Sequence, residues 1–296
     1  MNTTQQAPNY TSWVLLIVLA LIWGSSFILI KKSLVALSSL QVASLRIGIS
    51  ALAFSPVLAL QWSKIPRDKL KYLLVVGLAG SAIPAVLFSI AQTQISSSLA
   101  GLLNSLTPLF ALLISVLFFH QKVGKEKYVG VVLGFAGSAL LIILGSDLDD
   151  NKNVWFGLLV VGACLCYATS LNTVKHFLQD VGPILLSAVA YCLVGPLGIV
   201  ILCFTDWQTA MASDQFFWSM ASITALALLG TVFASVLFFK LVQMTNVIFS
   251  SAVAYLIPLV ALGFAFFDGE TINYVHFLGM ACILSGVFLS REKKKA

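Results

Sequence analysis

Arg46 is the one charged residue inside a long apolar segment, residues 39–61. A guanidinium is costly to bury at such depth, so it is a candidate functional group. Its planar fork of donors suits bidentate pairing with a carboxylate, which would make Arg46 a fixed cation for an acidic group of a small molecule. The alternative is a structural arginine that hydrogen-bonds the backbone carbonyls of a neighbouring or broken helix. The residues alone leave both interpretations open.

Uncharged polar and aromatic side chains in other apolar segments could complete a largely neutral cavity around such a cation. These groups hydrogen-bond or stack with a solute without adding charge at depth. The candidate substrate-binding residues, together with Arg46, are Trp23, Ser26, Phe27, Phe88, Asn104, Tyr167, Asn172 and Tyr255. The alternative is that Ser, Thr and Asn only hold helices together, which stabilises a bundle by about 0.6 kcal/mol each on average.

Pro108 and Pro258 lie in the middle of two apolar segments, 150 residues apart. A proline frees the backbone carbonyl one turn earlier, and in a membrane that carbonyl must face protein or a water-filled cavity. Interrupted helices of this kind mark the binding sites of many carriers. We therefore expect helix breaks at both prolines, with Asn104 placed one turn before the first.

Other kinds of chemistry find no support in the apolar segments. They hold no paired carboxylates, no serine with a histidine base and no cluster with metal-ligand spacing, so we expect no enzyme, no metal and no cofactor. No Asp or Glu lies in a segment core, which argues against a strongly proton-driven mechanism. Glu270 and His276 lie near a segment end and leave proton coupling open.

The composition indicates what positions these side chains. Of the 296 residues 59% are hydrophobic and only 9% are charged, with a mean hydropathy of +1.00. Soluble domains are about 25% charged, so a soluble, disordered or nucleic-acid-binding protein is excluded. The partner of this surface is the lipid bilayer, whose hydrocarbon core a helix of about 20 residues can cross. Ten segments have this character: 12–31, 39–61, 70–91, 97–119, 127–145, 154–174, 183–204, 216–239, 247–267 and 273–290.

The basic residues predict how the ten segments are oriented. Of the 17 Lys and Arg residues, 13 fall on the side of the C-terminus, 3 fall on the opposite side, and the last is Arg46. Cytoplasmic loops carry such an excess. We therefore expect a multi-pass protein of the cytoplasmic (inner) membrane with both termini in the cytoplasm.

The two halves of the chain are weakly similar. Trp23 corresponds to Tyr167, 144 residues later, and Pro108 corresponds to Pro258. Because five spans is an odd number, the second copy must cross the membrane in the opposite sense, as in the inverted repeats of secondary transporters. The predicted organisation is a cytoplasmic tail 1–11, a first five-helix repeat 12–145, an external linker 146–153, a second five-helix repeat 154–290 and a basic cytoplasmic tail 291–296.

Several motifs occur in order along the chain: LIWGSSF from Leu21 to Phe27, the two mid-segment prolines with aromatic helix ends, and the glycine-rich VGVVLGFAGSALLI and FLGMACILSGVFL. Together with the ten segments they resemble the drug/metabolite transporter superfamily, and more narrowly the bacterial ten-span EamA-type permeases. The resemblance implies transport of amino acids or other small metabolites, and it favours the structural interpretation of Arg46. Such families often carry Glu after the fourth and ninth spans. Here Glu270 fits the second, while His120, Gln121 and Lys122 stand at the first.

We therefore predict an all-α secondary transporter that moves a small molecule, an amino acid or related compound first, by alternating access and in the export direction. By the resemblance, the first, third, fourth, sixth, eighth and ninth spans line the cavity. A channel or facilitator for small neutral solutes and an importer of another metabolite class remain the alternatives. Monomer and homodimer both stay open.

Overall fold

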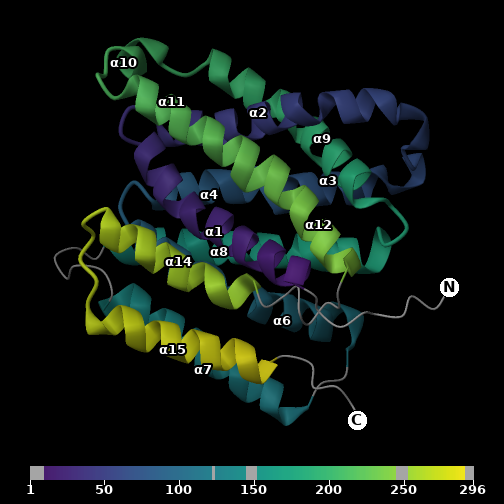
Figure 1. Cartoon of the computed structure of the whole chain (residues 1–296). Helices are drawn as coiled ribbons and strands as arrows, with labels where there is room; N and C mark the ends of the chain where they lie inside the picture. Colours follow the sequence, from purple (N-terminus) through teal and green to yellow (C-terminus); the bar gives the residue numbers. More distant parts are fainter. Residues whose placement is uncertain (1–9, 122–123, 145–151, 245–252, 291–296) are drawn as a thin grey trace.

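The computed structural model describes residues 10–121, 124–144, 152–244 and 253–290. Within these ranges every regular element is a helix, and long helices lie side by side across the whole molecule (Figure 1). The first half holds α1 (Tyr10–Ser33), α2 (Ser39–Leu60), α3 (Leu70–Gly77), α4 (Ile83–Ala91), α5 (Ser97–Leu103), α6 (Thr107–Phe119) and α7 (Lys125–Leu144). The all-helical class is confirmed for this part of the chain.

The described part of the second half is also helical. Its helices are α8 (Lys152–Phe177), α9 (Pro183–Cys203), the short α10 (Trp207–Met211), α11 (Phe216–Ala225), α12 (Ala234–Met244), α14 (Val253–Phe267) and α15 (Tyr274–Ser290). Each of the ten apolar segments coincides with described helix, although the ninth, 247–267, is described only from Val253. Consecutive helices such as α3 and α4 join into one continuous stretch. Eight such stretches in the described part are long and apolar enough to cross a membrane, and Leu256–Phe267 and Tyr274–Leu289 are shorter apolar helices.

Three spans change their winding part-way. A π-helical segment, η3 (Leu78–Ala82), joins α3 to α4, and a second, η5 (Leu226–Phe233), joins α11 to α12. A 3₁₀ turn, η4 (Asn104–Leu106), joins α5 to α6. Pro84 and Pro108 follow η3 and η4 and lack the N–H that a regular ladder needs. Short π segments are frequent at functional sites.

Small residues allow two pairs of helices to approach closely. α7 and α15 lie together at one side of the molecule (Figure 1), where a Cβ at Gly286 would come within 2.4 Å of the Gly130 carbonyl oxygen. α2 packs along α9, where a Cβ at Gly195 would come within 2.2 Å of the Ala51 Cβ. These glycines therefore join helices within one chain, as small residues do in membrane bundles.

The remaining contacts bring the first span of each half against the other half. α1 packs against α11 and α14, whereas α8 packs against α4 and α6. The resulting core includes large side chains that are fully buried, among them Leu19, Leu103 and Leu109. This interleaving surrounds the centre with α1, α2, α4, α8 and η5.

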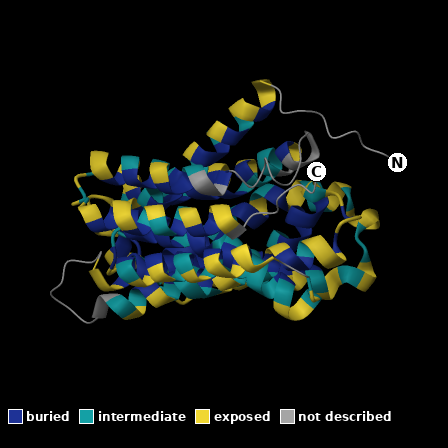
Figure 2. Ribbon diagram, turned by 90° about the horizontal axis from the view of Figure 1, so that it is seen from below, coloured by how far each residue is buried: buried dark blue, intermediate teal, exposed yellow. Residues whose placement is uncertain are grey.

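The outer faces of the helices remain apolar. Exposed residues lie along their outward sides (Figure 2), and they include Leu52, Val132, Trp155 and Phe233. Apolar surface of this extent is unfavourable in water but favourable in contact with lipid chains. Together with the spanning helices, this surface identifies a multi-pass membrane protein.

Candidate functional site

Arg46 lies on α2 where that helix meets η5. Its Nε–H donates to the Thr231 hydroxyl at 3.2 Å. Tyr167 on α8 and Tyr191 on α9 lie close enough for their hydroxyls to interact with the same positive charge. Among the described residues no Asp or Glu forms an ion pair with Arg46. The guanidinium is therefore a half-buried cation in a setting of hydroxyl groups.

Thr231 hydrogen-bonds only the Nε–H of Arg46. The bond through Nε supports the structural interpretation, since it ties α2 to the π-helical segment. It leaves the two terminal nitrogens, which form the fork suited to a carboxylate, for the tyrosines or for a solute. Tyr191 and Thr231 were not among the predicted residues. Tyr191 stands 145 residues after Arg46, close to the spacing of the two halves, and that spacing was the one signal for it.

Trp23 and Ser26 on α1 face the same π-helical segment. The Trp23 indole N–H donates to the Gly230 carbonyl oxygen at 3.1 Å, and its ring lies 5.3 Å from that of Phe238. The Ser26 hydroxyl donates to Ile22 within α1, and a Cβ at Gly230 would lie 3.0 Å from it. Glycine at 230 thus allows α1 to contact η5 closely.

Three predicted aromatic residues form a row from α1 to α8. The Phe27 and Phe88 ring centroids are 5.7 Å apart, and those of Phe88 and Tyr167 are 6.1 Å apart. Phe27 and Phe88 are buried, while Tyr167 is half-buried beside Arg46. The structure therefore brings Phe27, Phe88, Tyr167 and Arg46 together from four helices.

The turn before Pro108 presents polar groups inside the fourth span. Because Pro108 has no N–H, the Asn104 carbonyl accepts from Thr107 instead, through its backbone N–H and through its hydroxyl at 2.9 Å. The Asn104 carboxamide is half-buried and makes no side-chain hydrogen bond to the described residues. The Ser105 hydroxyl is buried and also lacks a partner there. The half-buried Asn104 carboxamide at mid-span is thus a candidate contact for a solute or for water.

Asn172 has a different environment from the other predicted residues. It accepts the Ser115 hydroxyl at 2.7 Å and donates to the Ala111 and Ala168 carbonyls, each at 3.0 Å. Every group of its carboxamide is therefore used to join α6 and α8. Pro258 lies inside α14, which continues as α-helix from Val253 to Phe267. The side chain of Tyr255 lies outside the described residues.

An ion-pair cluster joins the ends of α1 and α14 to the start of α5, and we call this side of the molecule the Glu270 end. Lys31 lies 2.8 Å from Glu270 and 2.9 Å from Asp268, and Lys32 also pairs with Asp268. Glu270 additionally accepts four hydrogen bonds, from the backbone N–H and the hydroxyl of both Ser97 and Ser98. Three spans from both halves are held together there.

The environment of Glu270 keeps its carboxylate charged. Burial by itself would raise the pKa of this carboxyl, but the hydrogen bonds from Lys31, Ser97 and Ser98 outweigh it and lower the pKa to about 2. The sequence showed Glu270 after the ninth span and Lys31 at the end of the first. It gave no sign that two residues 239 positions apart would meet.

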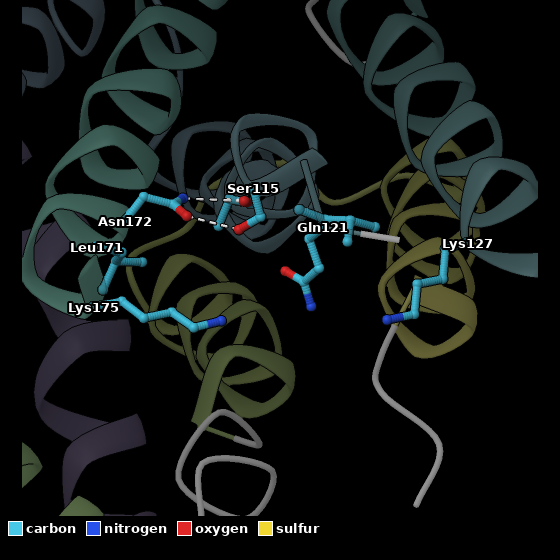
Figure 3. Close-up of a pocket in the computed structure, with 8 residues that line it drawn as sticks. Ser115, Gln121, Lys127, Leu171, Asn172 and Lys175 are labelled. Carbon is cyan, nitrogen blue, oxygen red and sulfur yellow. Dashed lines mark hydrogen bonds between the residues drawn. The ribbon is translucent and has the colours of Figure 1, made fainter. Parts of the chain in front are cut away.

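A cavity of about 180 Å³ opens at the opposite side, where α6 and α8 finish and α7 begins; we call this side the Lys175 end. Its walls are Ala111, Leu112, Ser115, Gln121, Lys127, Leu171, Asn172 and Lys175. In Figure 3 the side chains of Lys175 and Gln121 extend into this space, and Lys127 extends toward it from α7. The cavity combines apolar helix faces with two ammonium groups.

Comparison with known proteins assigns the chain to a family. The EamA-like transporter family matches residues 11–143 and again residues 154–291. The chain belongs to the EamA-like transporter family. The all-helical membrane fold described above is consistent with this membership, and the function that the membership indicates is that of a membrane transporter.

Individual relatives of this EamA protein are also named as transporters. It is 28% identical to the uncharacterized inner membrane transporter YedA of Escherichia coli K12, over 93% of this chain and 88% of that one. It is 25% identical to an S-adenosylmethionine/S-adenosylhomocysteine transporter of Chlamydia muridarum, over 82% and 79% of the two chains. A crystal structure of a protein 15% identical in sequence matches its fold with a TM-score of 0.63, over 96% of this chain and 97% of that one.

Proposed function

We propose that this protein is a secondary carrier for a small carboxylate-bearing solute, an amino acid or related compound first, working by alternating access and in the export direction. The observation that carries the proposal is Arg46, a cation at membrane depth that no carboxylate in the described part of the chain neutralises. An unpaired charge at depth is costly, so a solute carboxylate that pairs with it would gain binding energy.

The neighbours of Arg46 fit such a solute. Tyr167 and the hydroxyl of Thr231 contribute polarity, and the row through Phe88 to Phe27 offers an apolar wall for a side chain. Asn104, whose carboxamide makes no hydrogen bond to another described residue, is a further candidate contact from the fourth span. The proposed binding set keeps Trp23, Ser26 and Tyr255 and gives Asn172 a positioning role instead.

The arrangement of the helices supports two inverted five-helix halves, 12–145 and 154–290. Under that symmetry α1 corresponds to α8, η3 to η5, and α6 to α14. The contacts are reciprocal, because α1 packs on α11 and α14 while α8 packs on α4 and α6. The third span of each half contains a π-helical segment. Two equivalent halves that meet at a central site could rock against each other and expose that site to one side at a time.

We further propose that the Lys175 end faces the cytoplasm, as the basic residues predict. In this orientation the ion pairs of Lys31 with Asp268 and Glu270 close the external end, and the cavity beside Lys175 opens inward. The structure then corresponds to an inward-facing state of the carrier. Both termini lie in the cytoplasm, and the linker 146–153 is external.

Flux into proteoliposomes tests this function. Uptake of a radiolabelled amino-acid panel is measured with and without a pH gradient, and with excess unlabelled solute inside. We expect saturable uptake that internal solute accelerates, and the pH comparison separates proton coupling from exchange. Uptake that never saturates and ignores the internal solute would identify a channel and contradict the proposal.

A larger solute is the second candidate, because one relative is named for S-adenosylmethionine and S-adenosylhomocysteine. Both molecules carry an amino-acid carboxylate together with an adenine ring. The carboxylate could pair with Arg46 and the adenine could stack on the aromatic row of Phe27, Phe88 and Tyr167. Competition by each compound against amino-acid uptake in the same vesicles decides between the two.

A further inference from the structure

The cavity at the Lys175 end is positively charged. Lys127 and Lys175 line it with the amide of Gln121, and no Asp or Glu is among its described lining residues. Lys127 is buried, so its charge is poorly screened by water, whereas Lys175 is exposed at the mouth. Two lysines converge from α7 and α8 onto one space of about 180 Å³ (Figure 3). This volume is below that of drug-sized pockets and fits a small group.

The Glu270 end shows what occupies the corresponding position in the other half. α6 and α14 finish in the same way, each with a residue in the left-handed region, His120 with φ 51° and Gly269 with φ 81°. The next residue is Gln121 in the first half and Glu270 in the second. Lys175 near the end of α8 likewise corresponds to Lys31 near the end of α1.

At the Glu270 end, this arrangement holds an anion. The Glu270 carboxylate lies 2.8 Å from the Lys31 ammonium and accepts hydrogen bonds from Ser97 and Ser98. At the Lys175 end, the residue in the corresponding position has an uncharged amide, and the space beside it is open. Among the described residues, Lys175 therefore has no counterpart of the carboxylate that pairs with Lys31.

We infer that the cavity lined by Lys127, Lys175 and Gln121 binds a small oxyanion, a carboxylate or a phosphate, in the place that corresponds to the Glu270 carboxylate. The Lys175 ammonium pairs with the anion, Lys127 adds positive charge to the same space, and the Gln121 amide offers a further donor. Neither Arg46 nor Tyr167 lines this cavity, so the inference holds whichever solute is carried, and it rests on the correspondence of the two halves that belongs to the proposed function.

This chemistry has two sources, the oxyanion of a free solute and the phosphate of a lipid headgroup. Lysine acylation followed by mass spectrometry distinguishes them, because a bound anion keeps an ammonium protonated and slows its reaction. In neutral phosphatidylcholine nanodiscs, phosphate or acetate is titrated at constant ionic strength. In a second arm, phosphatidylglycerol replaces part of the lipid and phosphate and acetate are absent. Lys240, exposed on α12, serves as the internal control in every sample.

We expect saturable protection of Lys175 of at least fivefold, with Lys240 changing less than twofold. Protection by phosphate or acetate in neutral nanodiscs supports a free solute, and protection by phosphatidylglycerol alone supports a lipid headgroup. Gln121→Glu supplies the missing carboxylate within the chain, so Lys175 should react slowly throughout and added anions should have no further effect. Gln61→Glu places the same charge near the end of α2, outside the cavity, and should leave the anion effect on Lys175 unchanged.

Three outcomes overturn the inference. Protection that does not saturate, or that is equal at Lys175 and Lys240, indicates an adventitious ion only. Unprotected Lys175 in both arms shows that the cavity binds no oxyanion. Undiminished phosphate protection in Gln121→Glu shows that an anion binds elsewhere. The wild-type measurement decides the first two by itself if a variant does not fold.

Discussion

At the scale of single residues, the proposed function depends on Arg46. Its Nε is held by Thr231, so the guanidinium is fixed in place before any solute arrives. A fixed cation among hydroxyl groups needs no rearrangement to accept a carboxylate, and such preorganisation favours binding. The structural role and the binding role of Arg46 are therefore compatible, and a variant must separate them.

Arg46→Ala should weaken the binding of solutes that carry a carboxylate and leave the binding of other solutes largely unchanged. Loss of a charge-assisted pair costs about 1.5–3 kcal/mol, or roughly 10- to 150-fold in affinity. We expect this loss for the acid form of a transported amino acid and little change for its amide, measured by competition in proteoliposomes. Thr231→Val, which removes the partner of Nε and keeps the charge, is the control for positioning. Wild-type rate and affinity in Arg46→Ala would rule out the carboxylate role.

Glu270 should respond to pH in a defined direction. Its pKa is about 2 in the folded protein against an ordinary value of 4.5, so the ion pair contributes stability above about pH 4.5 and loses it as pH falls towards 2. Glu270→Gln should therefore lower thermal stability at pH 7, by about 1–3 kcal/mol, and the difference from wild type should shrink below pH 4.5. A difference that stays constant down to pH 2 would contradict this assignment.

The sequence indicated Arg46 as a candidate site but did not indicate the ion pair of Lys31 with Glu270. Arg46 could be found from the sequence because it is a single charge inside an apolar segment, where a side chain does not face water. Asn172 was also found, but its hydrogen bonds serve helix packing, a distinction that depends on neighbours the sequence does not place. The pairing of Lys31 with Glu270 depends on how the halves dock, so no local pattern could indicate it.

At the scale of elements, hydropathy was sufficient to locate the spans, because a helix in lipid must be apolar over its whole length. It did not reveal the π-helical segments. Pro84 follows the one between α3 and α4, but no proline lies in η5 (Leu226–Phe233), where the Gly230 carbonyl oxygen accepts the indole N–H of the distant Trp23. The glycine-rich fifth and tenth spans could be recognised in the sequence. The structure shows that their glycines allow α7 and α15 to pack closely together.

Gly286→Ala should loosen that contact. The added Cβ would lie 2.4 Å from the Gly130 carbonyl oxygen and 2.7 Å from the Gly134 nitrogen, both backbone atoms that cannot move independently. We expect a lower midpoint of thermal unfolding in detergent, by several degrees, because overpacking typically costs about 1–3 kcal/mol.

Gly263→Ala is the matched control, since a Cβ there meets nothing within 4 Å. Alanine stabilises a helix relative to glycine by up to about 1 kcal/mol, so this variant should unfold at the same or a higher temperature. Equal destabilisation by both substitutions would show that the α7–α15 contact is not responsible.

At the scale of the whole molecule, one end of the helix bundle is closed by side-chain contacts and the other end has a cavity. Ion pairs and serine hydrogen bonds hold α1, α5 and α14 together at the Glu270 end, while a cavity remains between α6, α7 and α8 at the Lys175 end. A carrier that alternates must break the first arrangement to release its solute on that side. A channel would have no need to do so.

Cross-linking the Glu270 end tests this central claim most directly. Lys32→Cys and Asp268→Cys remove the two ion pairs of Asp268, with Lys31 and with Lys32, and leave the Lys31–Glu270 pair intact, in a background without the five native cysteines. A short reducible bis-methanethiosulfonate joins the two thiols, and counterflow is measured in proteoliposomes, with each single-cysteine variant treated in parallel. We predict that the bridge abolishes counterflow, that reduction restores it, and that the single variants are unaffected. Undiminished counterflow across the bridged protein would contradict alternating access through this end.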